Sequence, residues 1–267
     1  MVERPAPTAS PGAPLEDPLA EALRLVRLAD ERGLLVRLLG GLGFQARLPG
    51  WDGGSARAQA ARRDIDLATR AADARAVGKM LVEAGYEPDT HYNALYGRKQ
   101  LYFLDPSHDR PVDVLVDALE MCHRFVFSER LSADHPTLPL AELLLSKLQV
   151  VRLNPKDVVD VLALVSRYPL ADHDRAAINA ARIADLTAID WGWWRTTTEN
   201  LDKLRHLAAS EVHRADYMGD DVLFDPGEQI LRLRETIDRA SKSRRWQLRA
   251  RVGDRLTWYQ EPEEVVH

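Results

Sequence analysis

The sequence has a single cysteine, Cys122, among its 267 residues. One cysteine excludes an intrachain disulfide and a zinc site built from several cysteines. The eight histidines show no metal-ligand spacing, and no G-x-x-x-x-G-K-[ST] loop is present, which argues against a zinc enzyme and a P-loop enzyme. No apolar run approaches the roughly 18 residues typical of a membrane span. Cys122 stands next to His123, which is poor geometry for a nucleophile and its base, so we expect Cys122 in the core.

The composition is that of a chain with a real core and an acidic balance. Apolar residues make up 45% of the chain and charged residues 29%, with a net charge of −5. This charge argues against non-specific coating of a nucleic acid but is compatible with a local basic groove. Residues 1–14 contain several prolines and no apolar signal core, so we expect a disordered lead-in and a cytoplasmic protein.

The pattern along the chain predicts an α/β (α+β) part followed by a helical part. In the first part, Asp17, Pro18 and Gly33 bound the first expected helix. We expect a further helix at 73–84, a loop at 49–60, and strands at 34–39, 65–69, 92–97, 100–104 and 112–116. The second part predicts helices at 139–152, 155–167, 172–185, 196–212 and 226–250, with a loose tail from residue 258. The expected domains are therefore 15–138 and 139–267.

Two aspartates share one face of a predicted strand. In Arg63-Asp64-Ile65-Asp66-Leu67, alternate side chains point the same way, so Asp64 and Asp66 lie together and opposite the apolar residues. Their repulsion is unfavourable unless a cation lies between them, and magnesium is the natural choice. The alternative is an exposed edge strand with two solvated acids, because D-x-D is common by chance.

A second acidic strand favours the metal interpretation. Asp113 is flanked by Val112 and Val114, which predicts a buried strand, and a third carboxylate is what two-metal phosphoryl chemistry requires. Asp117, at the end of this strand, is expected to cap a following helix. Gly40-Gly41, after the first strand, would let backbone amides approach a phosphate closely, although two glycines also simply end strands.

These residues resemble the nucleotidyltransferase superfamily, with its polymerase-β-like fold, and within it the AbiEii-like group of toxin and phage-defence nucleotidyltransferases. The match covers roughly residues 34–166. Its parts are Gly40-Gly41, Arg63 with Asp64 and Asp66, Asp113, and a helical signature. That signature consists of Lys147, Arg152, Lys156-Asp157 and Asp160.

The resemblance implies a role for each of these positions. Asp64, Asp66 and Asp113 would be catalytic metal ligands for two Mg²⁺ ions, and Lys147 would be a further catalytic residue. The implied substrate-binding residues are Gly40, Gly41, Arg63, Arg152, Lys156 and Asp157. The implied fold is a nucleotidyltransferase-type mixed sheet with flanking helices, followed by an all-helical C-terminal domain.

Lys147 and Asp157 also stand out without the resemblance. Lys147 falls within the apolar stripe of its helix, so it either faces a triphosphate or extends its long stem to the surface. Asp157 sits in the first turn after Asn154 and Pro155, where an acid is stabilised by the helix dipole. Orientation of Lys147 or Arg152 by Asp157 is the second interpretation.

The function predicted from the sequence is transfer of a nucleoside monophosphate from an NTP to an RNA (tRNA) end, with an antitoxin protein as the implied partner. The alternatives are nucleotidylation of a small molecule such as an aminoglycoside-type antibiotic, and a non-catalytic partner protein that retains the fold. The cluster of Trp191, Trp193 and Trp194 would pack between helices or, alternatively, stack on an RNA base.

Overall fold

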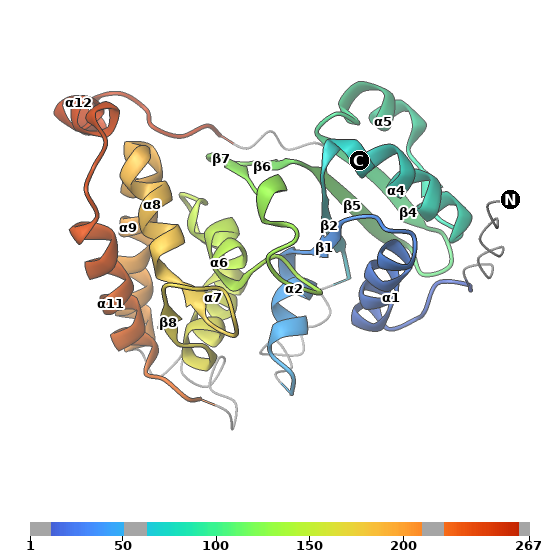
Figure 1. The fold of residues 1–267 in the computed structure, drawn as a ribbon, viewed down its shortest axis with the longest axis horizontal. Coiled ribbons are helices and arrows are strands. Elements are labelled where there is room, and N and C mark those ends of the chain that lie inside the picture. The colour runs from blue at the N-terminus through green and yellow to red at the C-terminus, as the bar shows by residue number, and fades with distance from the viewer. Residues whose placement is uncertain (1–11, 51–62, 210–221, 262–267) are drawn as a thin grey trace, which may run out of the picture.

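The acidic strands of the sequence lie at the centre of a five-stranded sheet. The computed structural model describes residues 12–50, 63–209 and 222–261. The strand order is β1-β2-β5-β4-β3, in which β2 and β5 are parallel and the other neighbours antiparallel. The strands are β1 (Val36–Leu38), β2 (Ile65–Thr69), β3 (Glu87–Pro88), β4 (Gln100–Asp105) and β5 (Arg110–Val116). The mixed α/β architecture is therefore confirmed (Figure 1).

Helices α1 (Pro18–Glu31) and α4 (Ala71–Glu83) cover one face of this sheet, and α5 (Thr90–Tyr96) follows β3. The covered face presents Ile65 and Leu67 of β2 with Val112 and Val114 of β5, all fully buried. These residues alternate with Asp66 and Asp113. The acidic face is therefore the one turned away from α1 and α4.

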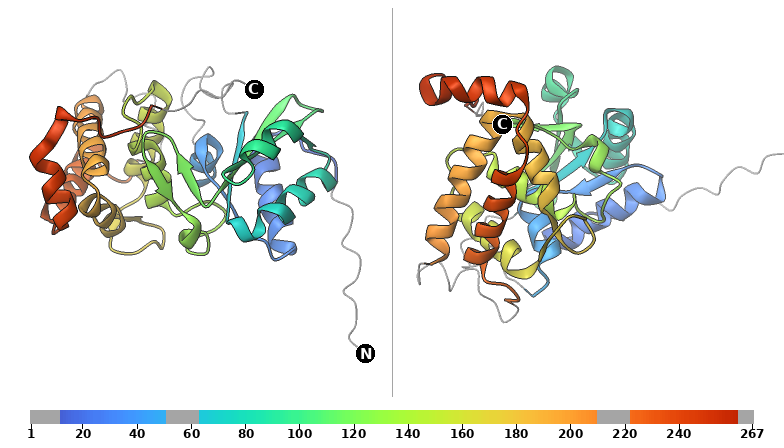
Figure 2. Two further views of the ribbon diagram at one scale, coloured as in Figure 1. Left: turned by 90° about the horizontal axis from the view of Figure 1, so that it is seen from above. Right: turned by 60° about the vertical axis from the view of Figure 1, so that its left-hand side comes forward.

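The opposite face of the sheet meets the helical part of the chain. Ala68 of β2 and Leu115 of β5 belong to the same apolar cluster as Phe44 and the buried leucines of the helical part. Helix α2 (Gly40–Arg47) packs on β2 and also on α6 and α7, so it lies where the two parts join (Figure 1). Figure 2 shows the same division from above, with the sheet and the later helices on opposite sides of α2.

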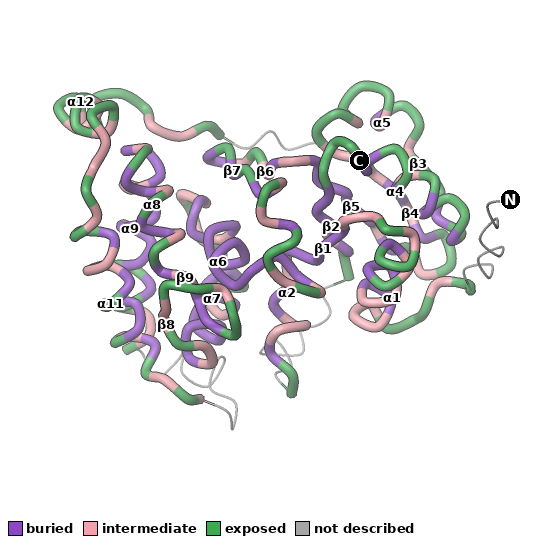
Figure 3. Tube along the Cα trace, viewed as in Figure 1, coloured by how far each residue is buried: buried purple, intermediate pink, exposed green. Residues whose placement is uncertain are grey.

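The later part of the chain is mainly helical, as the sequence predicts. The helices are α6 (Leu140–Leu148), α7 (Pro155–Arg167), α8 (Ala180–Ile189), α9 (Trp191–Ala208), α11 (Pro226–Arg239) and α12 (Arg244–Val252). Short elements join them: β6 (Ala118–Glu120), β7 (Arg124–Val126), η1 (Ser128–Arg130), β8 (Leu170–Ala171), β9 (Ile178–Asn179) and η2 (Gly253–Arg255). Figure 3 shows that α6 is buried, whereas α12 is mostly exposed.

Several boundaries differ from those predicted. Residues 92–96 belong to helix α5 and Gly97 ends it, so this segment is not a strand. Asp89 caps the helix by accepting from Tyr92 N–H, and the rings of Tyr92 and Tyr96 pack one turn apart, with centroids 4.9 Å apart. Gly40 and Gly41 begin α2 instead of merely ending a strand. The predicted helix at 172–185 is replaced by the β8–β9 pair and α8, which Asn179 caps. The predicted helix at 226–250 is interrupted, and Ser243 starts α12 with a cap of its own.

Three local predictions are tested directly. Asp17 caps α1 by accepting a hydrogen bond from Ala20 N–H at 2.6 Å, and Cys122 is buried, so both are confirmed. Asp117 does cap a helix, but the prediction that it caps the following helix is wrong. Its carboxylate accepts from Ala71 N–H, 3.0 Å away, at the start of the earlier helix α4, because no helix directly follows β5. The residues of the predicted lead-in before position 12 lie outside the described part of the chain.

The tryptophans pack within the structure. Trp193 is buried against Phe125 and His123, with ring centroids 5.8 Å and 5.2 Å away. Trp191 and Trp194 contact each other at 6.2 Å. The packing interpretation is thus confirmed for Trp193, whereas Trp191 also lines a pocket that is described below. Within the described residues, no helix combines the length and apolar character that crossing a membrane would require.

Candidate active site

The site begins with two carboxylates on neighbouring strands. Asp66 of β2 and Asp113 of β5 are direct partners in the parallel register. Side chains at paired positions of adjacent strands point to the same face of a sheet, so the two carboxylates lie side by side on the face turned toward the helical part. Both residues are half-buried. The register therefore brings together two acids that stand 47 positions apart in the sequence.

Gly40 is pressed against Asp66. A Cβ atom at Gly40 would lie 1.8 Å from Asp66 Oδ2, and the backbone at Gly40 has a φ of +62°. The preceding residue, Leu39, donates its N–H to the Asp66 carbonyl at 3.1 Å, which fixes the start of α2 beside β2. Only glycine fits this position, because it tolerates both the left-handed conformation and the close approach. Gly41 follows in the first turn of α2 and is half-buried.

Asp64 lies at the entrance of the same strand. It precedes β2 by one residue, is exposed, and stands two positions before Asp66. Partial burial of the carboxyl raises the pKa of Asp64, and the positive charges of Lys156 and Arg63 oppose this effect. Lys156 belongs to the first turn of α7, so the helical part reaches as far as Asp64.

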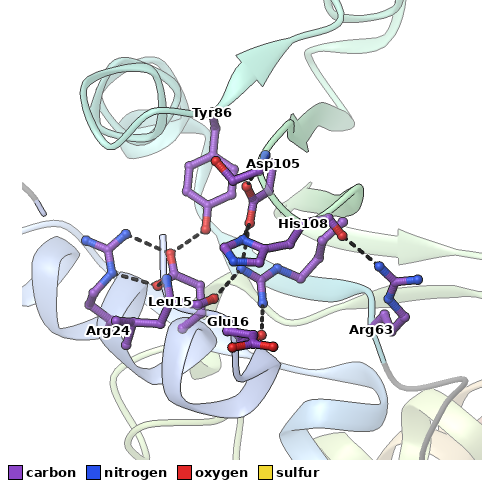
Figure 4. A network of polar contacts seen from close by, with 10 residues as sticks. Leu15, Glu16, Arg24, Arg63, Tyr86, Asp105 and His108 are labelled. Atoms are coloured by element: carbon purple, nitrogen blue, oxygen red, sulfur yellow. Dashed lines mark hydrogen bonds and ion pairs between the residues drawn. The ribbon is translucent and has the colours of Figure 1, made fainter. Parts of the chain in front are cut away.

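Arg63 takes part in a network that holds the β4–β5 turn. Its guanidinium donates to the carbonyl of His108 at 2.6 Å (Figure 4). His108 pairs with Asp105, and Asp105 also pairs with the buried Arg110. Arg110 in turn donates to the carbonyl of Leu15 before α1, at 2.8 Å. Arg63 therefore stabilises the strand ends next to Asp64, and the substrate-binding role predicted for it stays a prediction.

Burial and neighbouring charges shift the pKa of the Asp66 carboxyl. Burial raises the pKa of Asp66 to about 7, with a further increase from the nearby Asp113 and Asp64. Lys147 partly opposes this increase. A carboxyl with a pKa near 7 lies in an environment that disfavours its negative charge, and a bound cation would stabilise that charge.

The donor set fits a magnesium ion by its chemistry. Asp66 and Asp113 provide adjacent carboxylates, and Asp64 lies two residues before Asp66. Mg²⁺ prefers a few carboxylates together with substrate phosphates. Across the part of the chain that the structure describes, no three His, Cys, Asp or Glu side chains are already arranged around one point. A metal ion would therefore have to draw its ligands together, and substrate phosphates would complete the coordination.

Lys147 reaches the site from the helical part. Its ammonium pairs with Asp157 at 2.5 Å and with Asp160 at 3.5 Å, and lies 5.7 Å from the ring centroid of Phe44 in α2. Burial alone would lower the pKa of Lys147, but Asp157, Asp160 and, more weakly, Asp66 raise it overall. The ammonium is therefore charged, and its side chain is only 17% exposed. Lys147 does not simply extend to the surface.

Asp157 has both of the roles considered from the sequence: it lies in the first turn of α7, and it orients Lys147. Asn154 caps the helix by accepting from Asp157 N–H at 2.9 Å, with Pro155 in the first turn. The Asp157 carboxylate also holds Lys147. Arg152 and Lys156 are exposed. Of these two, Lys156 lies close enough to influence Asp64, and no such link to the carboxylates is evident for Arg152.

Two neighbours of Asp113 were missed from the sequence. Gln100 of β4 donates its side-chain N–H to Asp113 Oδ1 at 2.5 Å. Tyr102, also on β4, is the register partner of Asp113. Positions 100 and 102 alternate onto one face of a strand, but only the β4–β5 register reveals that this face is the one bearing Asp113.

Comparison with known proteins leaves the family of this chain open. No family model matches the sequence, and no curated protein matches it closely enough to count as a relative. Among solved structures, the chain is similar to the STING-associated CdnE c-di-GMP synthase from Capnocytophaga granulosa. The two are 15% identical, over 82% of this chain and 80% of that chain, with a TM-score of 0.23. A similarity this weak does not bear on activity.

Proposed function

We propose that this protein is a metal-dependent nucleotidyltransferase that moves a nucleoside monophosphate from a nucleoside triphosphate to an acceptor hydroxyl. The observation that carries the proposal is the register pairing of Asp66 with Asp113 on the sheet face that Lys147 reaches. Adjacent carboxylates, a close glycine backbone and a charged lysine are the groups that transfer of a phosphoryl group requires.

In this proposal, each group has a distinct task. Asp64, Asp66 and Asp113 would hold Mg²⁺, two ions being expected with bound NTP; bound metal would neutralise the triphosphate and favour ionisation of the attacking hydroxyl. Gly40 and Gly41 let phosphate oxygens approach backbone N–H groups at the start of α2. Lys147, oriented by Asp157, would balance the charge of the triphosphate.

The proposed reaction is a single in-line displacement. The acceptor oxygen forms a bond to the α-phosphorus, the bond between the α-phosphorus and the bridging oxygen breaks, and pyrophosphate leaves with that oxygen. The hydroxyl proton passes to a carboxylate of the site or to water. No covalent intermediate on the protein is required, so Cys122→Ala is expected to leave the reaction unchanged.

We propose an RNA end, with tRNA as the first candidate, as the acceptor. The AbiEii-like resemblance of Lys147, Arg152, Lys156, Asp157 and Asp160 supports this choice, and a toxin–antitoxin or defence setting with an antitoxin partner follows from the same resemblance. To test it, pyrophosphate release is measured with Mg²⁺, each of the four NTPs, and either total tRNA or a panel of amino sugars. Release with tRNA supports the proposal. Release with amino sugars alone assigns the acceptor to the antibiotic class, and absence of both release and triphosphate binding contradicts the enzyme proposal.

Lys147→Ala is expected to weaken binding of triphosphate with Mg²⁺ by at least about tenfold, the effect of one charge-assisted contact. Calorimetric titration measures the affinity, and Lys79→Ala is the control. Lys79 is 79% exposed and lies on α4, which covers the other face of the sheet. The variant also leaves Asp157 and Asp160 without their cation, so its thermal unfolding is recorded alongside. Equal affinities for the wild type and a folded Lys147→Ala variant would remove Lys147 from the site.

Magnesium is expected to stabilise the protein more at about pH 8 than at about pH 5. The pKa of Asp66 is about 7, so protons compete with the metal ion at the lower pH and no longer do so at the higher pH. The rise in Tm on adding MgCl₂ is measured at both pH values, with excess EDTA as the reversal. An equal rise at both pH values would show that the ion binds away from Asp66.

A further inference from the structure

A pocket lies in the helical part, away from the sheet. It has a volume of about 370 Å³ and is enclosed by α12, the start of α9, the β6–β7 turn and the segment that follows η2. In Figure 1 this last segment crosses over the β6–β7 hairpin. The crossing is fixed by the N–H of Gln260, which donates to the carbonyl of Cys122 at 2.9 Å. None of the tasks proposed above involves this pocket.

The pocket offers aromatic surfaces. Trp191, Trp258 and Tyr259 line it, with the rings of Trp191 and Trp258 packed edge to face at 6.0 Å. The indole N–H of Trp258 donates to Thr196 at 3.0 Å, which fixes the orientation of its ring. Rigid aromatic rings beside an open space are platforms on which a nucleic acid base can stack.

Arg245 provides the charge of the pocket. It is exposed, lines the pocket, and has no ion pair or hydrogen bond among the described residues. Arg249 is already engaged, because it donates to the carbonyls of Gly253 and Leu256. The one carboxylate in the lining, that of Asp190, accepts hydrogen bonds from two N–H groups at the start of α9. Arg245 is therefore the group available to an anion.

The histidine of the pocket adds no positive charge. Burial lowers the pKa of His123 to about 4, so its imidazole is neutral at physiological pH. It pairs with the hydroxyl of Thr196 at 2.9 Å. The charge that an anionic ligand would meet in this pocket comes from the arginines of α12.

Helix α12 concentrates positive charge in an acidic chain. Residues 244–255 contain five arginines and one acid, Asp254, whereas the whole chain has a net charge of −5. No residue of α12 is buried. A local basic surface with interleaved aromatic rings on an acidic protein indicates a confined site for a nucleic acid.

The pocket is connected to the proposed active site through one short segment. The N–H of Val151 donates to Cys122 Sγ at 3.5 Å, and the N–H of His123 donates to the side chain of Gln149 at 3.4 Å. Gln149 and Val151 lie two and four residues after Lys147, whose ammonium lies beside Phe44 at the junction with the sheet. The pocket wall and Lys147 are therefore joined by one short stretch of chain and its hydrogen bonds.

We propose that this pocket binds single-stranded RNA near the acceptor end, with one base stacked on Tyr259 and a phosphate paired with Arg245. The inference deepens the proposed function and rests on it, because it names the subsite that positions the acceptor. The exposed apolar side chains Leu248 and Val252 of α12 could instead serve a protein partner, which the experiment below separates from RNA.

The test measures binding of a short fluorescein-labelled single-stranded RNA by fluorescence anisotropy, without nucleotide and over a series of salt concentrations. Arg245→Ala is expected to weaken binding by about fivefold or more and to reduce the slope of log affinity against log salt by about one. The matched control is Arg251→Ala on the same helix; Arg251 is exposed and does not line the pocket. Its expected change is below about twofold.

A second variant tests stacking separately from charge. Tyr259→Ala is expected to weaken RNA binding by about fivefold or more while leaving the salt slope unchanged, since a ring contributes no counterion release. Equal losses for Arg245→Ala and Arg251→Ala would show that RNA is attracted to α12 by its overall charge and does not bind in the pocket. Unchanged binding in both variants would show that this face does not bind RNA, which leaves a protein partner as the alternative. Either result overturns the inference.

Measuring RNA binding and nucleotide transfer side by side for the wild type and Arg245→Ala separates the two proposals. If binding that is sensitive to Arg245 is present but the wild type transfers no nucleotide, the pocket inference stands and the proposed function fails. If transfer to RNA occurs with equal efficiency in the wild type and Arg245→Ala, the proposed function stands and the pocket inference fails.

Discussion

Replacing Asp66 by asparagine is expected to abolish nucleotidyl transfer and to make the metal-free protein more stable at about pH 8. Activity should fall by at least about 10³-fold, because the amide cannot replace a negatively charged metal ligand in a reaction that depends on charge neutralisation. The stability gain has the same origin. Burial, with Asp113 and Asp64, raises the pKa of Asp66 to about 7, so the ionised carboxylate is unfavourable in the folded protein.

The sign of the pH effect follows from proton binding. Between the ordinary pKa of an aspartate, about 4, and the value of about 7 in the folded protein, the folded state holds a proton that the unfolded state has lost. Wild-type stability attributable to Asp66 therefore falls as the pH rises through this window and stays low above it. Asp66→Asn removes this dependence. The variant should match the wild type near pH 4 and exceed it by about 1–3 kcal/mol at pH 8 without metal.

Denaturant unfolding in EDTA at several pH values measures the effect. Asp172→Asn is the control, since Asp172 is exposed in the β8–β9 loop and the same charge change there should have little influence. If Asp66→Asn destabilises the protein at pH 8 while the control does not, the ionised Asp66 carboxylate stabilises the fold, which contradicts this prediction.

Gly40→Ala is expected to reduce activity by at least about 100-fold and to destabilise the fold more than a simple change of glycine to alanine would. The added Cβ would lie 1.8 Å from Asp66 Oδ2, a distance that real structures do not tolerate. Either the start of α2 or the Asp66 side chain must move, and a displacement of about 1 Å is enough to cost about 100-fold in rate.

Gly33 provides the matched control. Its backbone has a φ of +70°, close to the +62° of Gly40, but an added Cβ would meet no atom within 4 Å. Gly33→Ala therefore introduces the left-handed strain of about 1–2 kcal/mol without a collision. The two variants are compared by Tm and by pyrophosphate release. Full activity in Gly40→Ala would mean that the contact with Asp66 does not position the site.

The parts of the site that follow from local patterns could be predicted from the sequence. Alternation along β2 places Asp66 opposite its apolar neighbours, and the Asn154–Pro155 start of α7 predicts the cap that the structure contains. The inward position of Lys147 in the α6 stripe is likewise visible in the sequence, and the structure adds its partner, Asp157.

The features that could not be predicted depend on contacts between distant segments. The resemblance implies that Asp66 and Asp113 share one site, but their direct pairing needs the parallel register of β2 and β5. The hydrogen bond from Gln100 likewise needs the register of β4. Local alternation also gave a wrong prediction, a strand at 92–97, where the Asp89 cap starts a helix. The carboxylate of Asp117 caps a helix that precedes it by 46 residues, which no local pattern reveals.

The most direct test of nucleotidyl transfer is to follow the fate of the individual phosphates of the donor. The protein is incubated with Mg²⁺ and total tRNA, and with NTPs carrying ³²P either at the α or at the γ position. The account predicts that the α label enters RNA, that the γ label appears only in pyrophosphate, and that Asp66→Asn shows neither. Entry of the γ label into RNA, or equal α labelling by the wild type and Asp66→Asn, would contradict it.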